Sequence, residues 1–140
     1  MSLEVSVVIP THNPRRDYLE QVLEGLKRQT LPVEKWELVI VDNASSKMGE
    51  GRWKMGGISN VRVVREERLG LTNARLRGFA ETTGEIIVLV DDDNVLASDY
   101  LEQVVRIGKE YPQLGTWSGA IELVLEPGSP QPAEKLRHLL

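Results

Sequence analysis

The sequence has no cysteine among its 140 residues, and this absence excludes disulfide bonds, thiolate metal sites and cysteine nucleophiles. Histidine occurs only twice, as His12 and His138, and two distant histidines favour no metal site. No apolar run approaches the about 20 residues that a membrane-spanning helix needs. Acidic residues outnumber basic ones by 21 to 17, which gives a net charge of −4. That charge argues against a general nucleic-acid-binding protein.

The remaining composition is that of a globular domain, with 41% hydrophobic and 27% charged residues. At this length we expect one domain over residues 1–140. Short apolar runs predict strands at residues 5–10, 37–42, 61–66, 85–90 and 116–125. Strands of this kind that alternate with helices indicate an α/β fold with a mostly parallel sheet and helices on both faces.

The predicted helices lie between these strands. Leucine and valine at helical spacing over residues 19–26 mark the first helix, which Asp17 and Glu20 would begin as a capping box. The second covers residues 70–84, with Gly84 as its stop signal. Ser98 or Asp99 opens the third, and a proline at position 112 ends it.

Polar residues follow four of the predicted strands, as THN (11–13), DNAS (42–45), REERLG (65–70) and DDDN (91–94). Because ligands bind beyond the carboxyl ends of parallel strands, we expect these residues to share one cleft. The three consecutive carboxylates of 91–93 would repel one another unless a cation lies between them, and Mg²⁺ or Mn²⁺ prefers such oxygen ligands. Basic residues outnumber acidic ones seven to two between positions 52 and 77, so a nucleotide diphosphate is the expected ligand.

A phosphatase of the haloacid-dehalogenase type is an alternative, with Asp91 as nucleophile and Asp93 as acid/base. That motif normally ends the first strand of its domain, whereas here most of the chain precedes it. A nicotinamide-binding domain needs a glycine-rich turn after the first strand, and PTHNPR (10–15) contains no glycine.

Four segments together resemble the inverting family 2 glycosyltransferases of the GT-A fold. They are VSVVIPTHN (5–13), LVIVDNAS (38–45), RLGLTNARLRG (68–78) and IIVLVDDDNVLASDYL (86–101). The resemblance covers about residues 4–110 and implies a Rossmann-like nucleotide-diphospho-sugar transferase fold, truncated after the Asp-x-Asp region. It divides the chain into a nucleotide-binding half at 4–115 and the start of an acceptor-side region at 116–140.

The resemblance also implies roles for residues of the nucleoside site. Thr11, His12 and Asn13 would line the base and ribose. Asp42 and Asn43 would bond the edge of the base, expected to be uracil or thymine.

Other positions would serve the diphosphate, the sugar and the metal. Asp91 and Asp92 would face the ribose and donor sugar, and Asp93, with Asp91, would hold Mn²⁺ or Mg²⁺ on the diphosphate. Arg75, with Arg68 beside it, would lie toward the diphosphate. In such an enzyme a sugar passes from the nucleotide donor to an acceptor with inversion.

Departures from the family pattern limit these expectations. Asn94 stands where an acidic residue is frequent, and Ser98 where a proline is. The family's general base is expected beyond Leu140, because the late carboxylates have no motif around them; these are Glu122, Glu126 and Glu134. We therefore expect a donor-binding fragment with weak or no transfer activity, which self-associates through exposed apolar surface. A non-catalytic nucleotide-binding module is the second alternative. The expected location is cytoplasmic, with membrane attachment of a longer protein and the acceptor left open.

Overall fold

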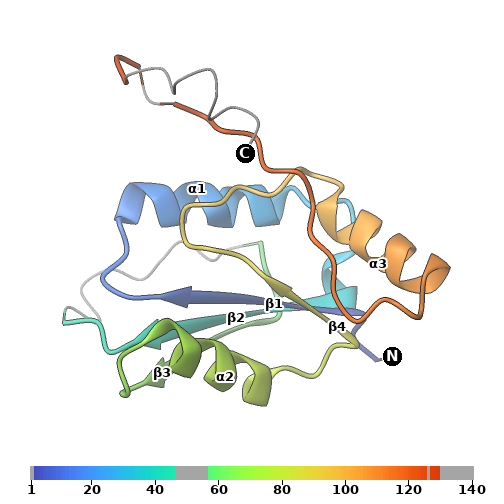
Figure 1. Ribbon diagram of the computed structural model, residues 1–140, viewed down its shortest axis with the longest axis horizontal. Helices are drawn as coiled ribbons and strands as arrows, with labels where there is room; N and C mark the ends of the chain where they lie inside the picture. The colour runs from blue at the N-terminus through green and yellow to red at the C-terminus, as the bar shows by residue number, and fades with distance from the viewer. Residues whose placement is uncertain (1, 47–56, 126, 130–140) are drawn as a thin grey trace.

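One parallel sheet forms the centre of the protein. The computed structural model describes residues 2–46, 57–125 and 127–129. Its strands lie in the order β3-β2-β1-β4 (Figure 1). They are β1 (Val5–Thr11), β2 (Trp36–Asn43), β3 (Val61–Glu66) and β4 (Ile86–Leu89). The helices are α1 (Arg16–Lys27), a short 3-10 turn η1 (Val33–Lys35), α2 (Leu71–Glu81) and α3 (Tyr100–Glu110). The predicted α/β class and the first four predicted strands are confirmed.

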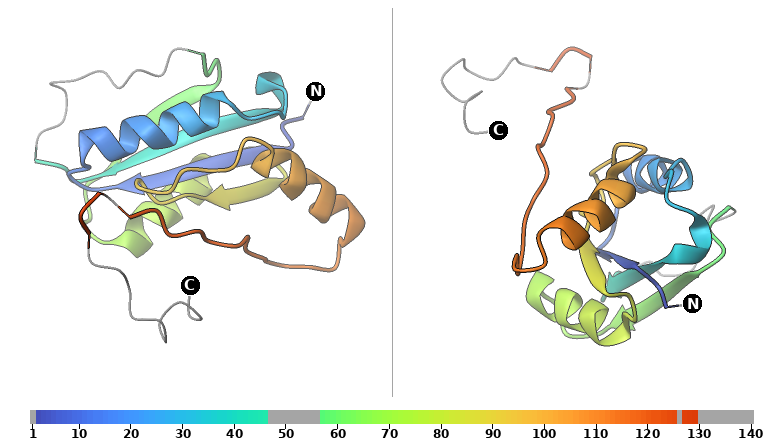
Figure 2. Two further views of the ribbon diagram at one scale, coloured as in Figure 1. Left: turned by 90° about the horizontal axis from the view of Figure 1, so that it is seen from above. Right: turned by 90° about the vertical axis from the view of Figure 1, so that its right-hand side faces the viewer.

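The two faces of the sheet are covered by different helices, as Figure 2 shows. On β1, Val5, Val7 and Ile9 face one way and pack with buried side chains of α1 and α3. Val8 faces the other way and packs with Ala74 of α2. This division follows from the alternation of side chains along a strand. The site residues are therefore held at the end of a well-packed sheet.

Burial decreases from the centre of the sheet to its edges. Every residue of β1 and β2 is buried, which agrees with their nearly continuous apolar sequences. β4 lies at an edge, and its Ile87 and Leu89 are 39% and 43% exposed. Exposed apolar side chains on a strand whose outer side pairs with no described strand are suited to association with another chain.

A hydrogen-bond network around one buried carboxylate lies at the amino-terminal ends of the strands, opposite the predicted site. Glu37 is 1% exposed, and its Oε1 accepts hydrogen bonds from Ser6 Oγ, at 2.7 Å, and from the backbone nitrogen and hydroxyl of Thr83. Arg62 Nη2 lies 3.0 Å from Oε2. Burial alone would raise the pKa of Glu37, but these hydrogen bonds and Arg62 outweigh it and hold the pKa below its usual value.

The predicted strand at 116–125 is wrong. These residues have no regular secondary structure, and Ile121 and Val124 are 69% and 86% exposed. In Figure 1 the orange-red segment turns back along α3 and then leads away past α1. Apolar sequence alone does not form a strand, because a strand requires hydrogen bonds to a neighbouring strand.

Two predictions about helix ends also need correction. The helix α1 starts with Arg15 as N-cap and has no side-chain cap, so the predicted capping box is absent. Asp17 instead accepts a hydrogen bond from Arg15 Nη2 at 2.7 Å. The helix α2 ends at Glu81, before Gly84. Gly84 serves close packing, since a Cβ there would lie 2.7 Å from the backbone nitrogen of Ser6.

The third helix begins as predicted, with Asp99 as its N-cap residue. Within the described ranges, no helix has both the length and the apolar character required to cross a membrane.

Candidate functional site

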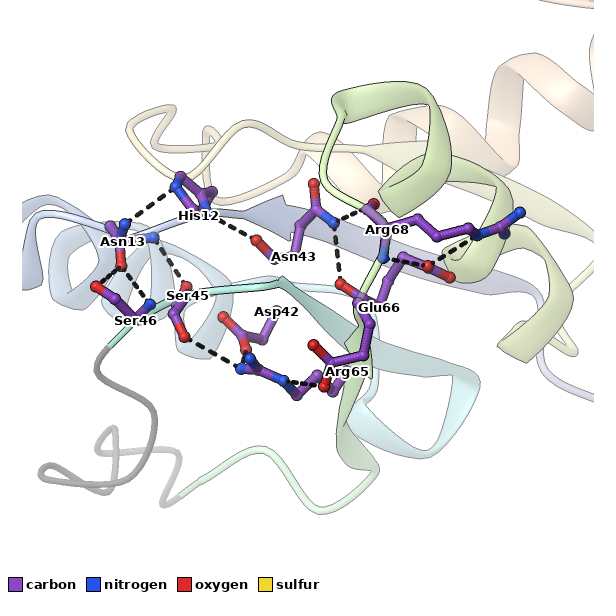
Figure 3. Close-up of polar contacts among 10 residues, drawn as sticks. His12, Asn13, Asp42, Asn43, Ser45, Ser46, Arg65, Glu66 and Arg68 are labelled. Atoms are coloured by element: carbon purple, nitrogen blue, oxygen red, sulfur yellow. Dashed lines mark hydrogen bonds and ion pairs between the residues drawn. The ribbon is translucent and has the colours of Figure 1, made fainter.

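The predicted site residues follow the carboxyl ends of the strands. Because all four strands are parallel, these ends lie at one edge of the sheet. Direct hydrogen bonds join the end of β1 to the loop after β4, the loop after β1 to the end of β2, and the end of β2 to the end of β3. Figure 3 shows the part of this network formed by the loops after β1, β2 and β3.

His12 bridges the loops that follow β1 and β2. Its Nδ1 donates to the carbonyl oxygen of Asn43 at 2.7 Å, and its Nε2 accepts from Asn13 Nδ2 at 3.0 Å. This pattern assigns the neutral tautomer with its hydrogen on Nδ1. Both ring nitrogens are therefore used within the protein, and the ring face is what His12 can offer to a base.

Asn13 fastens the same two loops from the other side. Its backbone nitrogen donates to Ser45 Oγ at 2.8 Å, and its Oδ1 accepts from Ser46 N and Oγ, at 2.9 and 3.1 Å. Its φ of +48° is a left-handed conformation, which asparagine tolerates better than most residues. The polar sequence after β1 thus fixes the shape of the cleft wall.

Asn43 is a positioning residue in this structure. Its side chain is nearly inaccessible, and its Nδ2 donates to the carbonyl oxygens of Glu66 at 3.0 Å and Arg68 at 2.8 Å. Its Oδ1 accepts from the backbone nitrogen of Gly70 at 2.8 Å. The amide therefore holds the loop between β3 and α2. The expected contact of Asn43 with a base stays a prediction.

Asp42 is paired with Arg65, a partner that the sequence did not predict for it. Asp42 is 1% exposed, and its Oδ2 accepts from Arg65 Nη1 at 2.6 Å. The two residues are register partners on β2 and β3. Its other oxygen, Oδ1, is buried and accepts no hydrogen bond from a described residue. Only the register between the strands identifies Arg65, because the sequence does not specify which residue of β3 lies beside Asp42.

A second carboxylate holds the other side of the Arg65 guanidinium. Arg65 Nε donates to Glu67 Oε1 at 2.7 Å. This hydrogen bond, with the negative charges of Glu67 and Asp42, raises the pKa of Arg65. Glu66, which accepts from the backbone nitrogen and Nε of Arg68, has its pKa lowered mainly by those bonds.

The basic residues between positions 52 and 77, here called the basic stretch, are mostly paired with carboxylates. Four of its arginines form ion pairs: Arg62 with Glu37, Arg65 with Asp42 and Glu67, Arg68 with Glu66, and Arg77 with Glu81. Arg52 and Lys54 lie outside the described residues. Arg75 of α2 forms no ion pair with any described residue, and its Nε is buried without a partner. Of the described arginines of this stretch, Arg75 is therefore the one without a carboxylate partner among the described residues.

The acidic triplet divides into one bonded and two unbonded carboxylates. Asp92 Oδ2 accepts a hydrogen bond from Thr11 Oγ1. Asp91 and Asp93 are exposed, and neither carboxylate bonds to a residue in the described ranges. The described part of the chain holds no group of three acidic or histidine residues arranged for a metal ion. Mg²⁺ in nucleotide sites is commonly bound by one or two carboxylates and by phosphates, so Asp91 and Asp93 fit that requirement.

Comparison with known proteins agrees with this geometry. The sequence profile described as "Glycosyl transferase family 2" matches residues 6–119. A dolichol-phosphate mannosyltransferase from Pyrococcus furiosus is 33% identical over 99 residues, which cover 65% of this chain and 26% of that protein.

Two solved structures have a similar fold. Residues 1–349 of TarS from S. aureus, in complex with UDP, have a TM-score of 0.69 at 25% identity, covering 79% of this chain and 33% of that one. The mannosyltransferase PcManGT from Pyrobaculum calidifontis, in complex with GDP-Man and Mn²⁺, has a TM-score of 0.56 at 31% identity, covering 66% of this chain and 28% of that one. The predicted GT-A fold is confirmed. The chain spans only about a third or less of the length of these proteins.

Proposed function

Because the chain belongs to glycosyl transferase family 2, we propose that it forms the donor site of an enzyme that transfers a sugar from a nucleotide diphosphate with inversion. The acceptor hydroxyl attacks the anomeric carbon, the bond from that carbon to the diphosphate oxygen breaks, and the nucleoside diphosphate leaves with the electron pair. The hydroxyl proton passes to a general base. No described residue is assigned as that base.

One observation carries the proposal. A buried carboxylate with an unpartnered oxygen, Asp42, shares the carboxyl edge of the sheet with the two unbonded carboxylates Asp91 and Asp93. Buried polar atoms without partners are rare, and each calls for an explanation. An N–H group of a nucleotide base would satisfy Asp42 Oδ1. The similar structures in complex with UDP and with GDP-Man support a nucleotide ligand for this protein.

The diphosphate end of the proposed site is formed by residues of α2 and of the loop that follows β4. Asp93 and Asp91 would hold a divalent cation, Mn²⁺ or Mg²⁺, which when bound supplies positive charge next to the leaving diphosphate. Thr11 orients Asp92 through its hydroxyl. Arg75, with its unpartnered Nε, would contact a phosphate oxygen, and such charge-assisted bonds are stronger than neutral ones.

Calorimetric titration of UDP tests the proposal. We expect UDP to bind in the presence of Mn²⁺ and to bind at least about tenfold more weakly with chelator or in Asp93→Ala, since one carboxylate ligand and its charge are lost. Glu85→Ala is the matched control, because Glu85 is an exposed carboxylate next to the other end of β4. Absence of binding to the folded protein, or equal loss in both variants, would contradict the proposal.

A further inference from the structure

The loop that carries the acidic triplet is bonded to the residues that follow α1. We propose that Gln29 is a positioning residue for the cation: it fixes the loop between β4 and α3, residues 90–99 and here called the acidic loop, and so holds Asp91 and Asp93 in place for a divalent cation. This inference rests on the proposed function, since it concerns the cation end of the same donor site.

The Gln29 amide bonds to three backbone groups. Its Nε2 donates to the carbonyl oxygen of Ala97 at 2.7 Å and to that of Gly25 at 3.3 Å, and its Oε1 accepts from the backbone nitrogen of Leu101 at 3.0 Å. Since carbonyl oxygens only accept and backbone nitrogens only donate, these partners assign the orientation of the amide. One side chain thereby joins α1, the acidic loop and α3.

Two of these bonds meet a requirement of a helix end. The first backbone nitrogens of a helix and its last carbonyl oxygens have no partner within the helix. Leu101 lies in the first turn of α3, where the N-cap Asp99 makes no side-chain cap, and Gly25 lies in the last turn of α1. Gln29 therefore serves both helix ends and ties the acidic loop to them.

Two further contacts bring the acidic loop against α1, and in Figure 1 the yellow-orange loop runs along this helix. The backbone nitrogen of Thr30 donates to the carbonyl oxygen of Ser98 at 2.8 Å. Gly25 leaves room for the loop, because a Cβ there would lie 2.8 Å from Val95 Cγ1 and 3.5 Å from the carbonyl oxygen of Leu96. The second half of the acidic loop is therefore fixed by α1 and the residues after it.

The first half of the acidic loop is held by β1. Asp92 accepts a hydrogen bond from the hydroxyl of Thr11 at the end of that strand. Asp91 and Asp93 thus lie between two fixed points of the loop and are themselves exposed. Carboxylates that are already held in place lose less conformational entropy when they bind a cation, so the groups that orient them raise its affinity. Loosening the second half of the loop should therefore weaken the binding of the cation.

Calorimetric titration of UDP into the 140-residue chain, with Mn²⁺ and then with chelator, tests this inference. The ratio of the two dissociation constants is the gain in affinity that Mn²⁺ confers. Gln29→Met keeps the side-chain length and removes the amide. We expect it to lower this gain about fivefold, the effect of losing one hydrogen bond to the acidic loop. The affinity for UDP with chelator should stay within about twofold of wild type.

Hydrogen exchange followed by NMR gives a second readout, which needs no metal. In the metal-free protein the backbone N–H of Leu101 should exchange at least about fivefold faster in Gln29→Met than in wild type, because it loses its acceptor. Gln21→Met is the matched control, since Gln21 is an exposed glutamine of α1. It should change neither the gain from Mn²⁺ nor the exchange rate.

An unchanged gain in Gln29→Met would assign Gln29 a structural role only, even if UDP binds equally more weakly with and without Mn²⁺. That result, or unchanged exchange of Leu101, would overturn the inference and leave the proposed function intact. If Gln29→Met does not fold, as judged by circular dichroism, Gln29→Asn replaces it, because its amide is one methylene too short to reach all three partners. Failure of both variants to fold would also overturn the inference.

The wild type separates this inference from the proposed function. UDP binding without any gain from Mn²⁺ would overturn the inference and leave the nucleotide site intact. Absence of UDP binding to the folded wild type would overturn both.

Discussion

Exchange of the Asn43 amide for a carboxylate should weaken the fold in a way that depends on pH. Asn43→Asp keeps the acceptor for Gly70 N but removes the two N–H groups that donate to Glu66 O and Arg68 O. Two lost hydrogen bonds cost about 1–3 kcal/mol, and a carboxylate oxygen facing two carbonyl oxygens adds repulsion. We expect the free energy of unfolding to fall by about 2–4 kcal/mol at pH 7.

The pH dependence separates this mechanism from a general loss of packing. Repulsion by the carbonyl oxygens and burial raise the folded-state pKa of the introduced carboxyl above its unfolded value of about 3.9. The folded state therefore binds the proton first, and the variant regains stability relative to wild type as the pH falls from 7 to 5. A protonated carboxyl also returns one donor to a carbonyl. Asn43→Ala, which removes all three bonds, should lose about 3 kcal/mol without this recovery.

Urea unfolding followed by circular dichroism at pH 7 and pH 5 measures both quantities. The comparison is between each variant and wild type at the same pH, since other carboxylates titrate in both. If Asn43→Asp proves as stable as wild type at pH 7, or loses stability further at pH 5, then the amide does not hold the loop between β3 and α2 as the structure shows.

Three further outcomes are expected. Since the pKa of Glu37 is lower in the folded state, its carboxylate stabilises the fold above the unfolded value of about pH 4.5. This contribution is lost as the pH falls through the folded pKa, so the stability difference between wild type and Glu37→Gln should shrink in acid. Gly84→Ala should cost about 1–3 kcal/mol in urea unfolding, because its Cβ would meet the backbone of Ser6, whereas Gly115→Ala, with open space around it, should be neutral. Light scattering should show concentration-dependent association of the wild type, reduced by Leu89→Lys; a monomer at all concentrations would contradict this.

The apolar patterns of the sequence were sufficient to predict the central strands and the three helices. The runs at 5–10 and 37–42 became strands buried on both faces, because their side chains are apolar in both directions. The same reasoning failed at 116–125, where the sequence also contains an apolar run but pairs with no described strand. Capping of α1 was also mispredicted, because Asp17 can bond to an arginine as readily as to a backbone nitrogen.

The candidate site could be predicted in part. Polar residues after each strand identified Thr11, Asp42 and the acidic triplet, since parallel strands bring their carboxyl ends together. Arg65 was expected near the cleft as part of REERLG (65–70), but its pairing with Asp42 was not predicted, because it depends on the register between β2 and β3. The excess of basic residues between positions 52 and 77 predicted a positive surface, but most of the described arginines there are paired with carboxylates.

The sequence by itself determined the α/β class, the helices and strands of the central sheet and the family, because these depend on local periodicity and on short motifs. The tertiary structure decided which hydrogen-bond partner each polar side chain has. In the structure the Asn43 amide bonds to the loop after β3, one oxygen of Asp42 accepts from Arg65, and Asp92 accepts from Thr11. The carboxylates of Asp91 and Asp93 bond to no described residue. Hydrogen-bond partners depend on strand register and on loop conformation, and neither is specified by residue type alone.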